Sequence, residues 1–360
     1  MKTLKRRWVN IMKGMWIVVI FVLMLVGGVY AKDNPIVIGI TEPDPISHIN
    51  LESTDGNYGS AYNGTLVFKK MVERESGGKM RVKIYPNCQL GGEHAQMEAV
   101  RLGTVQAGFI STCPFPLYTP EWMAFSIPYF IHSMPVMYKV LKGQVGKEFE
   151  DILLEKTGIR ILGWSQLGLR NFTNSVRPIH NPKDLKGMKI RVPKSADLVK
   201  LVEALGAQAA PISYSELYTA LQQGVVDGEE QTLNIFMAAK LNEVQKYVTL
   251  DRHKIEMNPF IINEKFYRSL SPENRRIVKD AAITACTSYR GLIEFGYHLW
   301  FKQLEKEGIE IYHPTEQELE QFRKAAKPVE GYIRSKAGDE WVDKVKNAVE
   351  EAKKSLYELD

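Results

Sequence analysis

The chain has 360 residues, enough for two domains of ordinary size, and a formal net charge of +5 at pH 7. The first 31 residues hold five basic residues and no acidic one, so the rest is neutral overall and does not indicate nucleic-acid binding. Cys88, Cys113 and Cys286 are too few and too scattered for a disulfide framework or a zinc site. One bridge, with Cys88 to Cys113 as the favoured pair, and three free or buried thiols both remain open.

Residues 1–31 have the pattern of a cleavable export signal. A basic start is followed by the apolar run "WIVVIFVLMLVGGV", and Ala31 stands just before the polar "KDNP". The apolar run is shorter than a typical membrane span, which favours a cleaved signal over the alternative, an uncleaved membrane anchor. No cysteine lies near the junction to carry a lipid. We therefore expect an exported protein whose mature part is not embedded in the membrane.

Strand and helix patterns alternate after the signal. In chain order we expect a strand at 35–40, a helix at 61–78, a strand at 79–86, a helix at 91–103 and a strand at 104–112. A loop rich in Pro, Asp, Ser and Gly, residues 41–59, follows the first strand. The same alternation restarts over 158–175. It predicts an α/β protein with a largely parallel sheet and helices on both faces.

The next strand brings an arginine to its end. In "MKIRVP" apolar residues alternate with Lys189 and Arg191, and Pro193 has no backbone donor with which to continue the ladder. Ser195 is placed to cap an amphipathic helix, and Gly206 ends that helix. Arg191 is therefore expected at the carboxyl end of a strand that leads into a helix. Open α/β sheets bind their ligands at this edge.

Another strand and helix follow at once. Residues 207–212 are expected to form a strand, and Ser213 with Glu216 has the S-x-x-E spacing of a capping box that begins a helix. Gly224 ends that helix. The next letters, "VVDG", indicate a short strand and a turn.

The pattern is then helical over 272–307, opened by Ser271 and Pro272 as cap and first helical residue. One continuous helix of this length would be on the order of 50 Å long, more than a small domain is wide, so we expect it to brace two lobes. Thr315 and Glu318 form a further capping box, which opens the C-terminal helices. No flexible linker is visible, so several strands are expected to join the lobes.

Familiar catalytic and phosphate-binding motifs are missing. The chain has no G-x-S-x-G, H-E-x-x-H, P-loop or G-x-G-x-x-G motif. His48, among Glu42, Asp44, Glu52 and Asp55, comes nearest to a metal cluster, but the spacing favours a solvated acidic loop. We expect neither a metal nor a cofactor. An exported α/β enzyme that acts on a carboxylate substrate remains the alternative, since catalytic groups often converge from distant positions.

Two arginines occupy comparable places in consecutive strand units. Arg170 lies in the strand-like "LGLRNFTN", and Arg191 follows in the next unit. A carboxylate that enters a cleft loses its water, which is costly unless charged donors replace it. The planar guanidinium fork can bond both carboxylate oxygens at once. The pair therefore indicates a site for an organic acid.

From about Pro35 to Lys279 the chain resembles the periplasmic solute-binding receptors of TRAP transporters, the C4-dicarboxylate-receptor type. The resemblance rests on "YPNCQLGG", "AVRLGTVQAGF", "IPYF", "GLRNFTNSVRPIHNPKDLKGMKIRVP", "YSELYTALQQGVVDGEE" and "NEKFYRSLSPENRRIVKDAA", in this order. It implies two α/β lobes around a cleft, with a long helix across both. It also implies capture of a small organic acid in the periplasm and delivery to membrane permease subunits.

The resemblance also implies roles for individual residues. Arg191 matches the arginine that typically forms the main salt bridge to the ligand carboxylate, and Arg170 matches a second common contact. Gln231 stands where the family has an asparagine that meets the carboxylate, and Thr232 replaces the following proline. The amide is thus kept one methylene further out, which implies a differently shaped cleft or a displaced ligand. Tyr214 matches an often aromatic position that packs on the ligand; packing at its own helix start is the alternative.

Two further residues are candidates with a structural alternative each. Trp164 could face the cleft or belong to the core. Glu93 could accept a hydrogen bond from a ligand hydroxyl, or stabilise the start of its helix through its negative charge.

The predicted organisation is therefore a signal peptide at 1–31 and two lobes. Lobe I comprises 33–167 and 257–296, and lobe II comprises 168–256 and 297–360. We expect a monomer in the periplasm that partners a small carboxylate and the permease, and no nucleic acid. A periplasmic sensor module that uses the same cleft is a further alternative.

Overall fold

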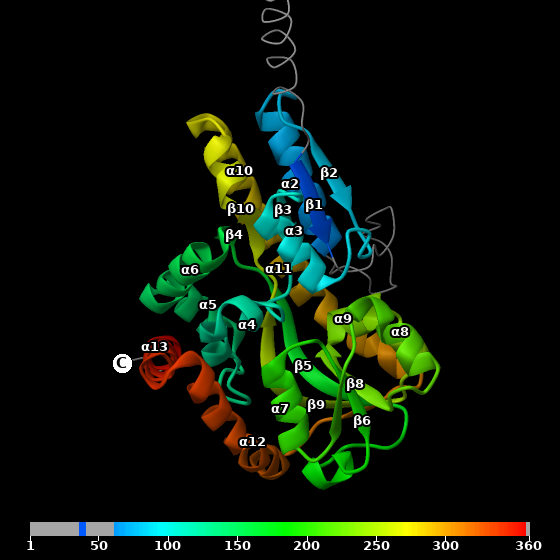
Figure 1. The fold of residues 1–360 in the computed structure, drawn as a ribbon. Coiled ribbons are helices and arrows are strands. Elements are labelled where there is room, and N and C mark those ends of the chain that lie inside the picture. Colours follow the sequence, from blue (N-terminus) through cyan, green and yellow to red (C-terminus); the bar gives the residue numbers. More distant parts are fainter. Residues whose placement is uncertain (1–35, 41–60, 358–360) are drawn as a thin grey trace, which may run out of the picture.

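The computed structural model describes residues 36–40 and 61–357. The predicted signal and the loop 41–59, with His48 and its acidic neighbours, lie outside these ranges. Among the helices within them, none has both the length and the apolar character needed to cross a membrane. Figure 1 shows two groups of strands, each with helices packed against it.

The first sheet has five strands. They are β1 (Ile36–Ile40), β2 (Val82–Tyr85), β3 (Ala107–Phe109), β4 (Ile159–Gly163) and β10 (Phe260–Asn263), in the order β2-β1-β3-β10-β4. The first three are parallel and alternate with the helices α2 (Ala61–Glu75) and α3 (Glu93–Leu102), as the sequence predicted. β10 is antiparallel to both of its neighbours.

The second sheet has six strands. They are β5 (Gln166–Asn174), β6 (Lys189–Val192), β7 (Gln208–Pro211), β8 (Gly228–Thr232), β9 (Tyr247–Met257) and β11 (Glu310–Tyr312), in the order β11-β9-β5-β8-β6-β7. β6, β7 and β8 are parallel, whereas β5 is antiparallel to β8 and β9. The strand expected in "VVDG" begins only at Gly228, where that motif ends.

Both sheets are therefore mixed, and the prediction of a largely parallel sheet is wrong. The reason lies in how the chain crosses between the sheets. It leaves the first sheet from β4 into β5 and returns from β9 into β10, and each outgoing strand pairs with the returning one. A strand that returns beside the outgoing one runs in the opposite direction. Several strands thus join the two halves, as the lack of a linker predicted.

A long helix also connects the two halves. α11 (Pro272–Lys306) has 35 residues and begins at Ser271, whose hydroxyl accepts a hydrogen bond from the backbone N–H of Asn274. It packs against α2 and β4 on one side of the molecule and against β5, β11 and α9 (Leu233–Ala238) on the other. The predicted bracing helix is confirmed (Figure 1).

Two helices close the chain. α12 (Glu316–Ala337) begins with the predicted capping box of Thr315 and Glu318, and α13 (Asp339–Tyr357) follows it. α12 packs on α7 (Ala196–Ala204), and α13 packs on α5 (Met134–Lys142) and α6 (Gln144–Thr157).

The lobe boundaries stay a prediction. They fit least well at α13, which was assigned to lobe II but contacts helices assigned to lobe I.

Two predicted caps do not form. Ser195 takes the N-cap position of α7, but its hydroxyl donates to the Asp197 carboxylate and caps no backbone N–H. Ser213 takes the N-cap position of α8 (Tyr214–Gln222) without a side-chain cap bond, so the box with Glu216 is absent.

The remaining helices are α4 (Phe115–Tyr118), α10 (Glu264–Ser269) and the 3-10 helices Pro120–Ser126, Pro182–Leu185 and Leu241–Glu243.

The three cysteines are free thiols, so the favoured bridge from Cys88 to Cys113 is not formed. The Cys113 sulfur instead donates to the Glu256 carboxylate across 3.4 Å. Cys286 is buried in α11, where its sulfur would lie 2.9 Å from a Cβ added at Gly163.

Gly228 lies so close to β5 that a side chain does not fit. A Cβ atom there would lie 2.1 Å from the carbonyl oxygen of Thr173. We expect Gly228→Ala to lower the free energy of unfolding by at least about 2 kcal/mol, because the two strands would have to separate. Gly291→Ala is the matched control: nothing lies within 4 Å of its added Cβ, and alanine in helix α11 should stabilise by roughly 0.5–1 kcal/mol. Urea denaturation measures both, and wild-type stability of Gly228→Ala would contradict the expectation.

Candidate functional site

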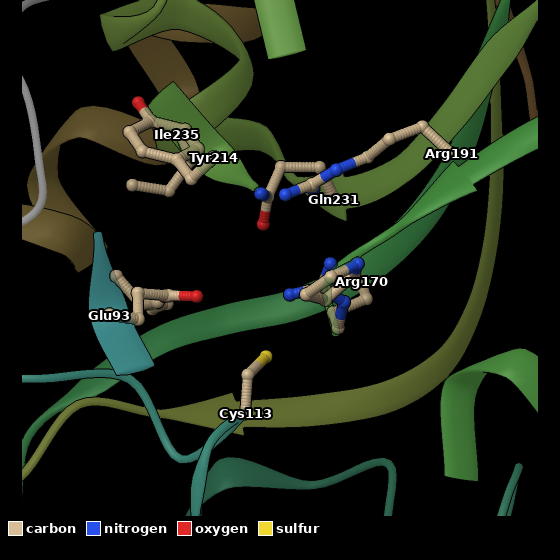
Figure 2. A pocket seen from close by; sticks show the side chains of 9 residues that line it. Glu93, Cys113, Arg170, Arg191, Tyr214, Gln231 and Ile235 are labelled. Carbon is tan, nitrogen blue, oxygen red and sulfur yellow. The ribbon is translucent and has the colours of Figure 1, made fainter. Parts of the chain in front are cut away.

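A pocket lies where side chains from β5, β6 and β8 converge with the start of α3. Figure 2 shows the guanidinium groups on one side and the Glu93 carboxylate on the other. The lining residues are Glu93, Cys113, Leu167, Arg170, Arg191, Pro193, Tyr214, Gln231 and Ile235. The cavity holds about 20 Å³, and a neighbouring cavity of about 170 Å³ shares four of these residues. Both halves of the molecule therefore contribute to the pocket.

Arg191 is held in place without being fully paired. It lies near the carboxyl end of β6, as predicted, and is 1% exposed. Its Nε donates to the carbonyl oxygen of Ile212 (2.9 Å), and its Nη1 lies 3.9 Å from the Glu229 carboxylate, too far for a hydrogen bond. Among the described residues Nη1 has no hydrogen-bond partner. The fork is thus oriented by the backbone but not occupied by a carboxylate.

The charge of Arg191 is also poorly balanced. Burial raises the pKa of Glu229 to about 8, although Arg191 opposes this, so the carboxyl is mostly protonated at pH 7. Burial likewise lowers the pKa of Arg191, and Glu229 opposes that shift. An arginine nevertheless keeps its proton in a protein. The result is a buried cation beside a largely neutral carboxyl, an arrangement that favours an incoming anion.

Arg170 is in the opposite situation. Its Nη2 donates to the Glu230 side chain (2.8 Å) and to the Glu230 carbonyl oxygen (2.6 Å), and its Nε donates to the other carboxylate oxygen of Glu230. Its Nη1 lies 3.5 Å from the Glu256 carboxylate. Burial alone would raise the pKa of Glu230, but Arg170 and His253 lower it to about 2. Arg170 therefore lines the pocket with its fork bound by Glu230 and with its Nη1 donating to Glu256.

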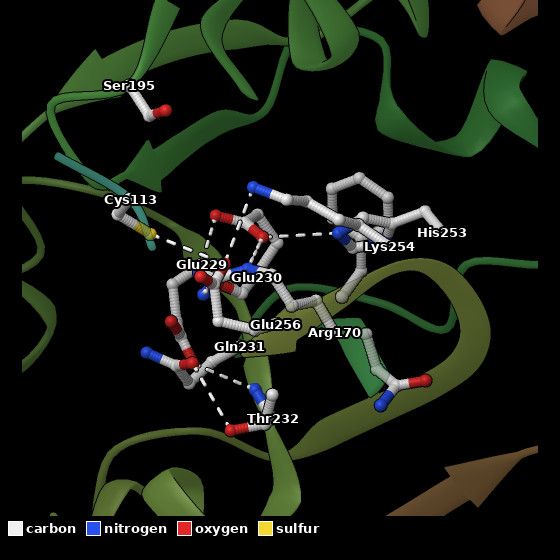
Figure 3. A network of polar contacts seen from close by, with 12 residues as sticks. Cys113, Arg170, Ser195, Glu229, Glu230, Gln231, Thr232, His253, Lys254 and Glu256 are labelled. Atoms are coloured by element: carbon white, nitrogen blue, oxygen red, sulfur yellow. Dashed lines mark hydrogen bonds and ion pairs between the residues drawn. The ribbon is translucent and has the colours of Figure 1, made fainter. Parts of the chain in front are cut away.

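A buried network surrounds this pair (Figure 3). His253 lies between Asp251 (Nδ1, 2.9 Å) and Glu230 (Nε2, 3.1 Å). Lys254 lies 3.3 Å from Asp197 and 3.4 Å from Glu256. Although burial alone would lower it, Asp251 and Glu230 raise the pKa of His253 to about 9. These paired charges form the wall behind the pocket.

Sequence reasoning missed this network. Glu229, Glu230, His253, Lys254 and Glu256 are all buried on β8 and β9. A signal was present in "GEEQT" and "DRHKIEM", because so many charged residues in strands beside two candidate arginines must be paired if they are buried. The apolar lining residues Leu167 and Ile235 were also missed.

Gln231 and Glu93 both reach the pocket. The Gln231 side-chain oxygen accepts a hydrogen bond from the backbone N–H of Thr232 (2.9 Å). Glu93 is the first residue of α3, and one of its carboxylate oxygens accepts from the hydroxyl of Ser111. Tyr214 lines the pocket at the first residue of α8.

Trp164 does not join the other five predicted residues. It is buried and stacks on Trp122 with ring centroids 5.6 Å apart, and its Nε1 donates to Glu150 (2.7 Å). It is therefore a core tryptophan, the alternative that the sequence left open. Among the residues with described positions, no group of three His, Cys, Asp or Glu side chains is arranged to hold a metal ion.

A model of the family described as bacterial extracellular solute-binding protein, family 7, matches residues 55–336. The chain belongs to this family. The C4-dicarboxylate-binding periplasmic protein DctP of Rhodobacter capsulatus is 30% identical over 91% of this chain and 96% of its own length. The resemblance inferred from the sequence motifs is thereby confirmed.

Solved structures support the same conclusion. The sugar acid binding protein of Advenella mimigardefordensis in complex with galactonate has a TM-score of 0.81 at 29% identity, over 89% of this chain and 99% of that one. The TRAP periplasmic solute binding protein of Ralstonia eutropha with bound (S)-2-acetolactate has a TM-score of 0.80 at 28% identity, over 88% and 98%. The predicted two-lobed α/β fold is confirmed.

The buried imidazole makes stability depend on pH. The pKa of His253 is about 9 in the folded protein and near 6.5 when unfolded, so its contribution is complete below about pH 6.5 and lost as pH rises through 9. We expect His253→Gln to be less stable than the wild type at pH 6, with the difference shrinking by up to roughly 3 kcal/mol at pH 9.5. Urea denaturation at several pH values measures it. The exposed His298→Gln is the control and should follow the wild-type profile; a His253→Gln profile parallel to the wild type would contradict the assignment.

Proposed function

We propose that this protein is the periplasmic receptor of a TRAP transporter, which captures a small organic acid through a salt bridge between its carboxylate and Arg191 and delivers it to the membrane permease. The observation that carries the proposal is the buried Arg191 fork, which is oriented by Ile212 and has no hydrogen-bonded carboxylate among the described residues. The named relatives, which bind C4-dicarboxylates, galactonate or acetolactate, support an organic acid as the ligand class. Export by residues 1–31 and a monomeric state belong to the same proposal.

The five predicted residues that line the pocket each have a role in this proposal, whereas Trp164 has none. Arg191 neutralises the carboxylate, and the Gln231 amide nitrogen donates to it. Arg170 adds its Nη1 from a fixed position, because Glu230 holds the rest of its fork. Glu93 faces the two arginines across the pocket and accepts from a ligand hydroxyl (Figure 2). Tyr214 supplies apolar surface.

Capture requires the pocket to open. The cavity of about 20 Å³ and its neighbour of about 170 Å³ are together smaller than the several hundred Å³ of a typical ligand pocket. The halves are joined by the crossing strands and by α11, so they can move as bodies about these connections. A ligand that contacts both halves shifts the population toward the closed state. Capture and delivery need no catalytic step, and family membership speaks against the exported-enzyme alternative.

We expect Arg191→Ala to weaken binding at least about tenfold, a loss of roughly 1.4 kcal/mol, because the ligand carboxylate loses its charged donor. The ligand is first identified by mass spectrometry of material released from the denatured wild type, with galactonate, acetolactate and succinate as additional probes. Isothermal calorimetry then gives the affinities. Lys189→Ala, on the same strand but outside the pocket lining, is the control. Equal affinities of the wild type and Arg191→Ala would overturn the proposal.

Binding should also weaken at alkaline pH. Glu229 ionises near pH 8, and its carboxylate then competes with the ligand for Arg191. Wild-type affinity is therefore expected to fall by up to about tenfold between pH 7 and pH 9. Glu229→Gln, which has no proton to lose, should show a flat profile over this interval. Calorimetry at pH 7 and pH 9 measures the affinities of both proteins. An equal fall in affinity in the wild type and in Glu229→Gln would exclude Glu229 as the cause.

A further inference from the structure

The pocket residue Gln231 is hydrogen-bonded through its side chain to the next residue in the chain, Thr232. The amide oxygen of Gln231 accepts from the Thr232 backbone N–H at 2.9 Å, and the Thr232 hydroxyl lies 3.4 Å from the same oxygen. Gln231 lines the pocket and Thr232 is fully buried. No hydrogen bond of the Gln231 amide nitrogen occurs among the described residues, and that nitrogen is not counted among the buried atoms without a partner. The oxygen is thus occupied and the nitrogen is free to donate.

The Thr232 N–H is available for this bond because the sheet does not use it. Ser175 N–H donates to the Asp227 carbonyl oxygen, which makes Asn174 and Gly228 a non-hydrogen-bonded pair of the antiparallel ladder. Non-hydrogen-bonded pairs recur at every second residue along an antiparallel ladder. Arg170 and Thr232 therefore also form such a pair. The Thr232 N–H therefore points away from β5, towards the side of β6, which has already ended at Val192. Without the Gln231 oxygen this buried donor would have no partner in the ladder.

We propose that Thr232 is a positioning residue for ligand binding: its backbone N–H holds the Gln231 amide oxygen, so that only the amide nitrogen faces the pocket. This inference rests on the proposed function. A free glutamine amide can turn either its oxygen or its nitrogen toward a ligand, and the oxygen would repel a carboxylate. Fixing the oxygen makes Gln231 a donor only, which matches the carboxylate beside Arg191 and lowers the ordering cost of binding.

A proline tests this directly, because it removes the N–H and leaves the rest of the backbone intact. Thr232 has φ −84°, close to the value that proline requires, and the residue before it is in an extended strand. Neither the ladder nor α9 needs the lost N–H, since Thr232 is the N-cap residue of that helix. We expect Thr232→Pro to fold and to bind about five- to tenfold more weakly than the wild type. Thr232→Val keeps the N–H and should lose at most about twofold.

A double-mutant cycle separates positioning from a general effect on the pocket. Gln231→Ala should lose about as much affinity as Thr232→Pro, and adding Thr232→Pro to Gln231→Ala should cost nothing further. Calorimetry with galactonate, acetolactate and succinate as probes gives the affinities. Equal binding by Thr232→Pro and Thr232→Val, or additive losses in the double variant, would overturn the inference.

A second measurement needs no ligand. In the unliganded protein, hydrogen exchange followed by NMR should show the Thr232 amide protected, and Gln231→Ala should speed its exchange at least about tenfold. Unchanged exchange in Gln231→Ala would overturn the inference even if the protein binds acids well. If the wild type binds none of the probes and releases no organic acid on denaturation, the proposed function fails, and the exchange experiment still decides whether Gln231 holds this N–H.

Discussion

The surrounding structure depends on the guanidinium of Arg191, which is buried near the carboxyl end of β6. Taking a cation out of water is costly unless other groups replace the lost hydration. Among the described residues, Arg191 bonds to one backbone carbonyl, that of Ile212, and lies near the Glu229 carboxyl, which burial keeps mostly protonated. The fold therefore holds a charge whose best partner is an anion from outside. Because its Nε is already bonded to the backbone, an anion that bound there would take little conformational freedom from the side chain.

The incomplete pairing is specific to Arg191, because Arg170 in the same sheet is bound by a carboxylate. Both arginines are almost fully buried and lie on neighbouring parts of one sheet. Arg170 is locked by Glu230, which His253 supports in turn, so its charge is compensated before any ligand binds. Two arginines that look alike in the sequence therefore differ in their pairing: Arg170 is bound by Glu230, whereas Arg191 has no hydrogen-bonded carboxylate among the described residues.

The sequence predicted the elements well where apolar periodicity was clear. The strand before Pro193, the helix from Pro272 and the cap at Thr315 follow from alternation, proline and capping residues. Prediction failed at β8, because "GEEQT" is polar and has no apolar face, although every residue in it is buried. It also could not separate Trp164 from the pocket, since a tryptophan beside a site strand and one in the core have the same local sequence. Burial of paired charges is a tertiary property that one strand does not reveal.

The crossing strands carry part of the charged wall between the two sheets. Arg170 lies on β5 and His253 on β9, and these two strands pair while carrying the chain from one sheet to the other. Their register shifts on both sides of Arg170, and Gly168 has φ +120°, a conformation that a residue with a side chain rarely adopts. Such irregularities let paired strands bend without losing the whole ladder. Because Glu230 and His253 tie Arg170 to both neighbouring strands, bending at these points would move the wall as a unit. The ion pairs thus hold the charged face of the pocket together across β5, β8 and β9.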